Sequence, residues 1–223
     1  MTWRMDARTL RFVVIGVVIL LAIGAKVTAT RGSSGTDATQ HKLTPQVRAA
    51  GLTFEPGVAP GDQQWVLAAI ANARPEAQQL IGAVDGLVTI GTVNLPGAPF
   101  VGVAQPGSDD IRLNIAYLDG ERKQDRSTAV LHELGHVVDF ELIPDDQMRE
   151  LAGAIPSSGG GCLTAETGDC TASEERFADT FAKWALRGSV SIIGAGYGVM
   201  SPASLETWGQ PLGLLAAQQS VTR

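Results

Sequence analysis

The stretch STAVLHELGHVVDFE, residues 127–141, is the most informative part of this chain for its fold and its function. Its apolar residues are dense, and it contains one glycine and no proline. This composition predicts a helix that begins at Arg122 or Ser127 and ends at Glu141, because Pro144 follows and cannot continue it. The predicted helix is strongly apolar, so we expect it to be buried in the core of the molecule.

Within this predicted helix, His132-Glu133-Leu134-Gly135-His136 form an H-E-x-x-H motif. Residues four apart share a helix face, so both imidazoles can reach one metal ion. Glu133 lies about 100° around the helix from His132, where it can take a proton from water without being a ligand. The alternative is a pair of ordinary helix histidines, which would need buried hydrogen-bond partners. The motif therefore predicts two metal ligands and a general base.

A catalytic zinc site needs a third protein ligand and keeps a fourth position for water. Downstream, Ser173 is a plausible N-cap for another helix, on which Glu175 and Asp179 share a face. We assign Glu175 as the third ligand and Asp179 as the acceptor of the free ring N–H of His132. The alternative is that these carboxylates merely decorate the solvated start of a helix.

H-E-x-x-H followed on a later helix by E-x-x-x-D resembles the gluzincin group of metallopeptidases, which includes thermolysin. The resemblance covers roughly residues 60–187, and the compact arrangement is also similar to the catalytic domain of anthrax lethal factor. It implies an α+β, zincin-like fold, with a small mixed sheet packed on the H-E-x-x-H helix and on a second ligand-bearing helix. It also implies Zn²⁺ and carries over to His132, Glu133, His136, Glu175 and Asp179. The 39 residues from His136 to Glu175 are a longer separation than in thermolysin.

Three β-like runs, 87–93, 100–104 and 111–118, precede the motif helix. The last run alternates apolar and polar residues, which predicts a half-buried or edge strand that could pair with an extended peptide substrate. Catalysis on a carbonyl usually needs a second donor to the oxyanion besides the metal. Tyr117 and Tyr197 are the candidates, and ordinary packing or surface contact is the alternative for both.

The amino-terminal segment predicts export. Phe12–Ala25 is an unbroken run of 14 apolar or glycine residues, which Arg8 and Arg11 precede. It suits a signal peptide, or an uncleaved signal anchor if the run is counted through Ala29, and a buried core helix is the remaining alternative. We therefore expect a segment 1–29, a flexible linker 30–42 and a catalytic domain 43–223. The protein is expected to be a single-pass membrane protein with an extracytoplasmic domain, or secreted.

Charge and cysteine content agree with that location. The chain carries a net charge of −6, and residues 1–31 carry +4, so the remainder carries −10. An acidic domain is repelled by phosphate backbones, which argues against nucleic acid as a partner. Cys162 and Cys170 are expected to form a disulfide in an exported chain, and zinc ligation by cysteine is the alternative.

Together these features predict a zinc-dependent endopeptidase that hydrolyses peptide bonds in a peptide or protein substrate outside the cytoplasmic membrane. A non-catalytic, membrane-tethered protein with a relic zincin fold is one alternative. A zinc amidase that acts on a cell-wall substrate is the other.

Overall fold

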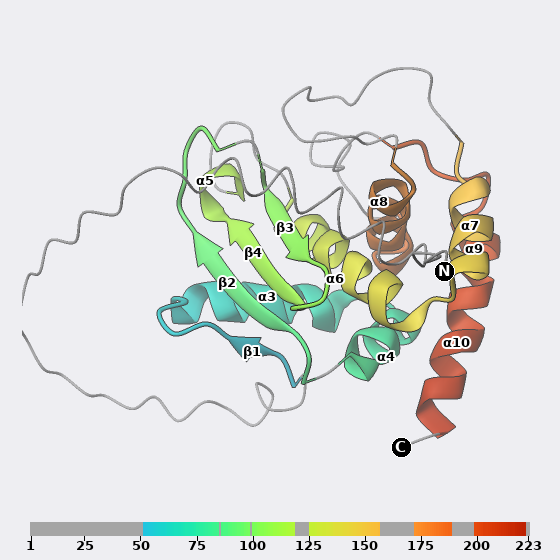
Figure 1. Ribbon diagram of the computed structural model, residues 1–223, viewed down its shortest axis with the longest axis horizontal. Helices are drawn as coiled ribbons and strands as arrows, with labels where there is room; N and C mark the ends of the chain where they lie inside the picture. The colour runs from blue at the N-terminus through green and yellow to red at the C-terminus, as the bar shows by residue number, and fades with distance from the viewer. Residues whose placement is uncertain are drawn as a thin grey trace, which may run out of the picture. The chain divides into compact units, whose positions relative to one another are not determined.

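Two helices of this chain carry the predicted ligands, and a small sheet lies beside one of them (Figure 1). The computed structural model describes residues 51–84, 86–98, 100–118, 125–156, 172–188 and 199–221, all within one unit, Leu43–Arg223. The elements in these ranges are β1 (Thr53–Phe54), α3 (Pro60–Asn72), α4 (Pro75–Ala83), β2 (Thr89–Val93), β3 (Gly102–Gln105), β4 (Asp110–Asn114), α5 (Ile115–Leu118), α6 (Arg126–Leu142), α7 (Asp145–Gly153), α8 (Ser173–Ala185), α9 (Leu205–Trp208) and α10 (Gln210–Val221).

The four strands form a mixed sheet in the order β1-β2-β4-β3, which confirms the expected α+β class with a small mixed sheet. β1 and β4 run parallel to β2, whereas β3 runs antiparallel to β4. Of the two alternatives predicted for 111–118, the half-buried strand agrees with the burial of β4, and the edge strand is wrong. β4 lies between β2 and β3, and residues 115–118 form helix α5. Alternation reports that one face of a strand is buried, and it carries no information about how many neighbours the strand has.

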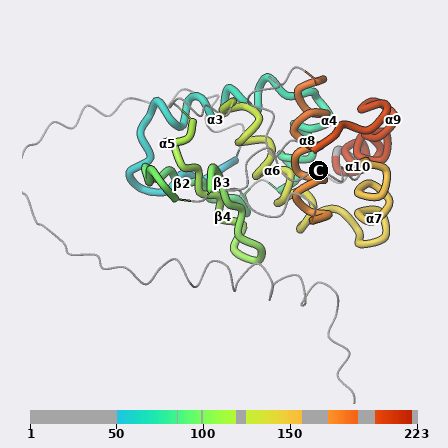
Figure 2. The backbone as a smooth tube through the Cα atoms, turned by 90° about the horizontal axis from the view of Figure 1, so that it is seen from above, coloured from blue at the N-terminus to red at the C-terminus, as the bar shows by residue number. Residues whose placement is uncertain are grey.

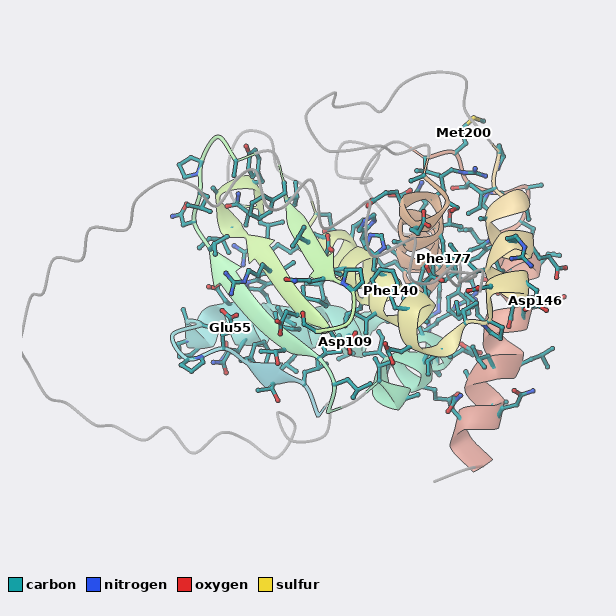
Figure 3. All side chains as sticks on the ribbon, viewed as in Figure 1. Glu55, Asp109, Phe140, Asp146, Phe177 and Met200 are labelled. Atoms are coloured by element: carbon teal, nitrogen blue, oxygen red, sulfur yellow. The ribbon has the colours of Figure 1, made fainter. Side chains whose placement is uncertain are left out.

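The two faces of the sheet differ in their environment. Ile111 and Leu113 of β4 are almost completely buried, whereas Arg112 between them is exposed. α3 lies on the buried side, behind the sheet in Figure 1 and above it in Figure 2, and α6 contacts α3, β3 and β4. On the open side, Arg112 forms an ion pair of 3.1 Å with Glu55, which Figure 3 labels over the front of the sheet. We call these the inner and the outer face.

Helix α6 forms where the motif predicts it, with ends that have local causes. The carboxylate of Asp125 caps its first turn by accepting a hydrogen bond of 2.7 Å from the backbone N–H of Thr128. The helix ends at Leu142, two residues before Pro144. Every residue from Thr128 to Asp139 is buried, so both faces of α6 contribute to the core.

Helix α8 crosses α6 at close range. A Cβ atom placed on Gly135 would lie 3.1 Å from the Cα atom of Ala178, so the glycine lets the two backbones approach. Phe177 and Phe181 of α8 are fully buried at this contact. The predicted N-cap is wrong by one residue: Ala172 occupies that position, and the Ser173 hydroxyl donates instead to the Glu174 carboxylate at 3.0 Å.

Several predictions concern residues that the structure does not describe. The segment 1–29, the linker 30–42, the cysteines Cys162 and Cys170, and Tyr197 all lie outside the described ranges. Within those ranges, no helix combines the length and the apolar character that crossing a membrane requires.

Candidate metal centre

The predicted ligands from α6 and α8 converge on one point. The Nε2 atoms of His132 and His136 lie 3.2 Å apart. The carboxylate of Glu175 approaches both rings, at 3.2 Å from His132 Nε2 and 3.5 Å from His136 Nε2. One ligand atom from each of the three residues lies within 4.8 Å of the other two. The His132, His136 and Glu175 group can therefore hold a metal ion.

The donor set indicates which class of ion fits. Two imidazole nitrogens and one carboxylate oxygen suit a transition metal, whereas magnesium and calcium prefer oxygen ligands alone. A tetrahedral ion with bonds of about 2.0–2.1 Å separates its ligand atoms by about 3.3 Å. The three shortest separations, 3.2, 3.2 and 3.5 Å, agree with that value. The group thus has the chemistry and the spacing of three corners of a small tetrahedral site.

Electrostatic coupling links Glu175 to the histidines. Burial lowers the pKa of His136. The charge of Glu175, the hydrogen bond from His136 to Glu175, and the charges of Glu133 and Asp139 outweigh burial and raise this pKa to about 9. Burial raises the pKa of Glu175, but His136 and His132 outweigh it and hold this pKa well below its usual range. Without a metal, the site is therefore an imidazolium paired with a carboxylate, and an incoming cation must displace the proton.

Glu133 lies beside this group, between α6 and the sheet. Only 3% of its surface is exposed, and burial raises its pKa above the usual value. The negative charge of Glu175 raises the pKa of Glu133 further. The charges of His132 and His136 lower it, and so does a hydrogen bond from the backbone N–H of Ala104. A buried carboxylate with a raised pKa holds a proton more firmly than an exposed glutamate does, as a group that must accept and then return a proton requires.

Asp179, the predicted partner of His132, is completely buried one turn after Glu175. Its carboxylate forms an ion pair of 2.5 Å with the ammonium group of Lys183, which also donates to the carbonyl of Val199. The hydrogen bond between Asp179 and His132 stays a prediction. Sequence reasoning missed Lys183, although a lysine four residues after an aspartate, among apolar neighbours, was the available signal.

Arg176 joins the first turn of α8 to the end of α7. Its guanidinium donates to the carbonyls of Ala152, at 2.5 Å, and Ile155, at 2.6 Å. The Ala152 carbonyl lies in the last turn of α7 and also accepts the backbone N–H of Ile155 at 3.3 Å, whereas the Ile155 carbonyl lies two residues beyond the helix. Because Arg176 directly follows Glu175, this contact holds the third ligand in position.

Phe140 and Tyr117 have contrasting contacts. Phe140, labelled in Figure 3, stacks on His136 with ring centroids 5.9 Å apart and an interplanar angle of 18°. Tyr117 of α5 donates its hydroxyl proton to the carbonyl of Ala98. That bond occupies the proton an oxyanion would need, so the oxyanion role of Tyr117 stays a prediction that requires the bond to break.

Family models, curated proteins and solved structures were each compared with this chain, and none matches it. The residues of the metal centre therefore carry the functional argument by themselves.

Proposed function

We propose that this chain is a zinc-dependent metallopeptidase of the gluzincin type. One observation carries the proposal: two imidazoles of α6 and one carboxylate of α8 meet at tetrahedral spacing, and the buried carboxylate of Glu133 interacts with all three. A purely structural zinc site would normally have four protein ligands and no need for a base. The arrangement favours an enzyme over a relic fold.

The residues divide the chemistry as follows. His132, His136 and Glu175 would hold the ion. When bound, zinc would supply a Lewis acid that lowers the pKa of water and polarises a carbonyl. Glu133 would take a proton from the attacking water on its carboxylate and transfer it to the leaving nitrogen. Its raised pKa supports both halves of this transfer, since a carboxylate that holds its proton too weakly cannot return it.

The edge of β3 is the surface we propose for the substrate backbone. In an antiparallel pair, alternate residues direct their N–H and C=O groups away from the partner strand. The bond from Asn114 N–H to the Val101 carbonyl makes that pair a hydrogen-bonded one, so Gly102 and Ala104 direct theirs outward. The Ala104 N–H already donates to Glu133, so the N–H of Gly102 and the two carbonyls are the groups proposed to meet the substrate. Within the described ranges, no strand pairs with this edge. This assignment replaces the predicted one at 111–118, and it supports an extended peptide as the substrate.

The proposed location is outside the cytoplasmic membrane, with the segment 1–29 as signal anchor or signal peptide. The support is the apolar run after Arg8 and Arg11 and the acidic remainder of the chain.

The test is the substitution Glu133→Gln in the full-length chain, with Glu141→Gln on the exposed end of the same helix as the control. Glu133→Gln should bind about one zinc per chain and lose hydrolysis of a peptide library by a factor of about 10² to 10⁴. Glu141→Gln should cleave like the wild type. Equal cleavage by both variants would remove Glu133 from the mechanism. Cleavage of peptidoglycan fragments but not of peptides would identify an amidase instead.

A further inference from the structure

The inner face of β3 has a gap in which the Glu133 side chain lies. A Cβ atom placed on Gly102 would lie 2.4 Å from Oε1 of Glu133, 2.7 Å from its Cδ and 2.8 Å from its Cγ. Non-bonded atoms do not approach a Cβ atom this closely, so any side chain at residue 102 would displace the Glu133 side chain. Gly102 is not among the glycines with a positive φ, so its backbone conformation is open to other residues. The requirement at this position is for space.

The carboxylate has little freedom to move away from such a clash. Glu133 is buried on α6, and the N–H of Ala104 donates to it from the same strand. Gly102 and Ala104 are two residues apart, so both face α6, in register with Leu113 and Ile111 of the inner face. β3 thus packs against one side of the Glu133 side chain, while α6 holds its backbone.

We propose that Gly102 is a positioning residue for the general base of this enzyme, a role that rests on the proposed function. The absence of a side chain at residue 102 lets the Glu133 carboxylate lie against the edge of β3, between the metal ligands and the proposed substrate strand. A displacement of about 1 Å in a catalytic group costs on the order of 10² in rate. A single methyl group at residue 102 is therefore expected to lower turnover without touching a metal ligand.

The chain contains a matched control for this contact. A Cβ atom placed on Gly91 of β2 would also lie 2.4 Å from a glutamate oxygen, Oε2 of Glu55. That contact is on the outer face, where the Glu55 side chain is 33% exposed and pairs with Arg112. Glu55 can move into solvent, whereas Glu133 cannot. The two glycines therefore differ in what the same substitution displaces.

The first arm of the experiment measures steady-state kinetics and zinc content of the full-length Gly102→Ala and Gly91→Ala variants. Gly102→Ala should lower kcat about 10²-fold with KM within about twofold and an unchanged zinc content. Gly91→Ala should keep kcat within about twofold. If Gly102→Ala hydrolyses like the wild type, the proposal is overturned while the proposed function stands. If the zinc-loaded wild type hydrolyses neither peptides nor peptidoglycan fragments, the proposed function fails, and the general-base role with it.

The second arm needs no activity and measures thermal unfolding of a double-mutant cycle. Gly102→Ala should lower Tm by roughly 4–10 °C, because the added methyl overpacks a buried site. In a Glu133→Ala background, the same substitution should change Tm by less than about 2 °C. If the double variant Gly102→Ala/Glu133→Ala folds and Gly102→Ala alone does not, that result would equally support the contact between Gly102 and Glu133. An equal loss in both backgrounds, or failure of both variants to fold, would show that Glu133 is not what requires the glycine.

Discussion

Helices α6 and α8 both contribute to the candidate metal centre, but they are positioned by different kinds of interaction. α6 has its own side-chain cap at Asp125, and both of its ligands follow from spacing within one helix. α8 has no side-chain cap, and Glu175 lies in its first turn. Arg176 contacts α7 and Lys183 contacts Val199, so α8 depends on bonds to other parts of the chain. Local interactions within α6 therefore position the two histidines, whereas contacts with other parts of the chain position Glu175.

The largest expected effect tests the anchoring of α8. Lys183→Met removes the opposing charge from the fully buried Asp179 and should lower the free energy of unfolding by about 3–5 kcal/mol. Arg112→Met breaks the exposed pair with Glu55 and should cost less than about 1 kcal/mol. Denaturant unfolding of both variants makes the comparison. Similar losses would show that the buried pair does not anchor α8.

A second prediction compares one ligand from each helix. Structural zinc sites bind with roughly 10–16 kcal/mol shared among four ligands, so loss of one ligand costs on the order of 100-fold or more in affinity. His136→Ala should reach that loss, measured by competition with a chromophoric chelator. Glu175→Ala should lose less, because the Glu175 side chain is 29% exposed and water can take its place. Unchanged affinity in Glu175→Ala would move the third ligand elsewhere.

Asp179→Asn decides whether α8 also supports α6 through His132. If the carboxylate orients the His132 ring, zinc affinity should fall 10–100-fold. Zinc affinity equal to that of the wild type would limit Asp179 to its ion pair with Lys183. The same competition measurement serves both ligand experiments.

Arg176→Ala is expected to have a smaller effect. The loss of a charged donor from the carbonyls of Ala152 and Ile155 should lower the free energy of unfolding by about 1.5–3 kcal/mol. It should also weaken zinc binding, because the first turn of α8 carries Glu175. Arg149→Ala, on the exposed face of α7, is the control and should change neither quantity. If Arg176→Ala binds zinc like the wild type, the contact of Arg176 with α7 is not needed to position Glu175.

The smallest effect concerns the metal-free state. The pKa of His136 is raised to about 9, so its pairing with Glu175 stabilises the fold fully below about pH 6.5 and is lost as the pH rises through 9. The lowered pKa of Glu175 places the opposite loss below about pH 4.5. Chelator-treated protein should therefore have a free energy of unfolding lower by about 1 kcal/mol at pH 9.5 than at pH 6.5, measured by denaturant unfolding, since water screens the partly exposed Glu175. His136→Ala should abolish this difference, and its persistence would assign the effect to another group.

The sequence alone determined the α6 half of the centre. His132, Glu133 and His136 are related by helical periodicity, which acts over a few residues and can be read without a structure. Spacing also indicated Glu175 and Asp179 as neighbours on one face of a later helix. It could not show that this face meets α6, because that requires the crossing at Gly135 and the docking of Arg176.

Tertiary packing alone establishes which strand is the edge, which side chain lies against Gly102, and which charge faces Asp179. Each of these depends on pairings between residues distant in the chain, where local propensity carries no information. A glycine in a strand and a lysine in a helix become meaningful once the opposite surface is known. Periodicity places side chains on one element, and packing between elements selects their partners.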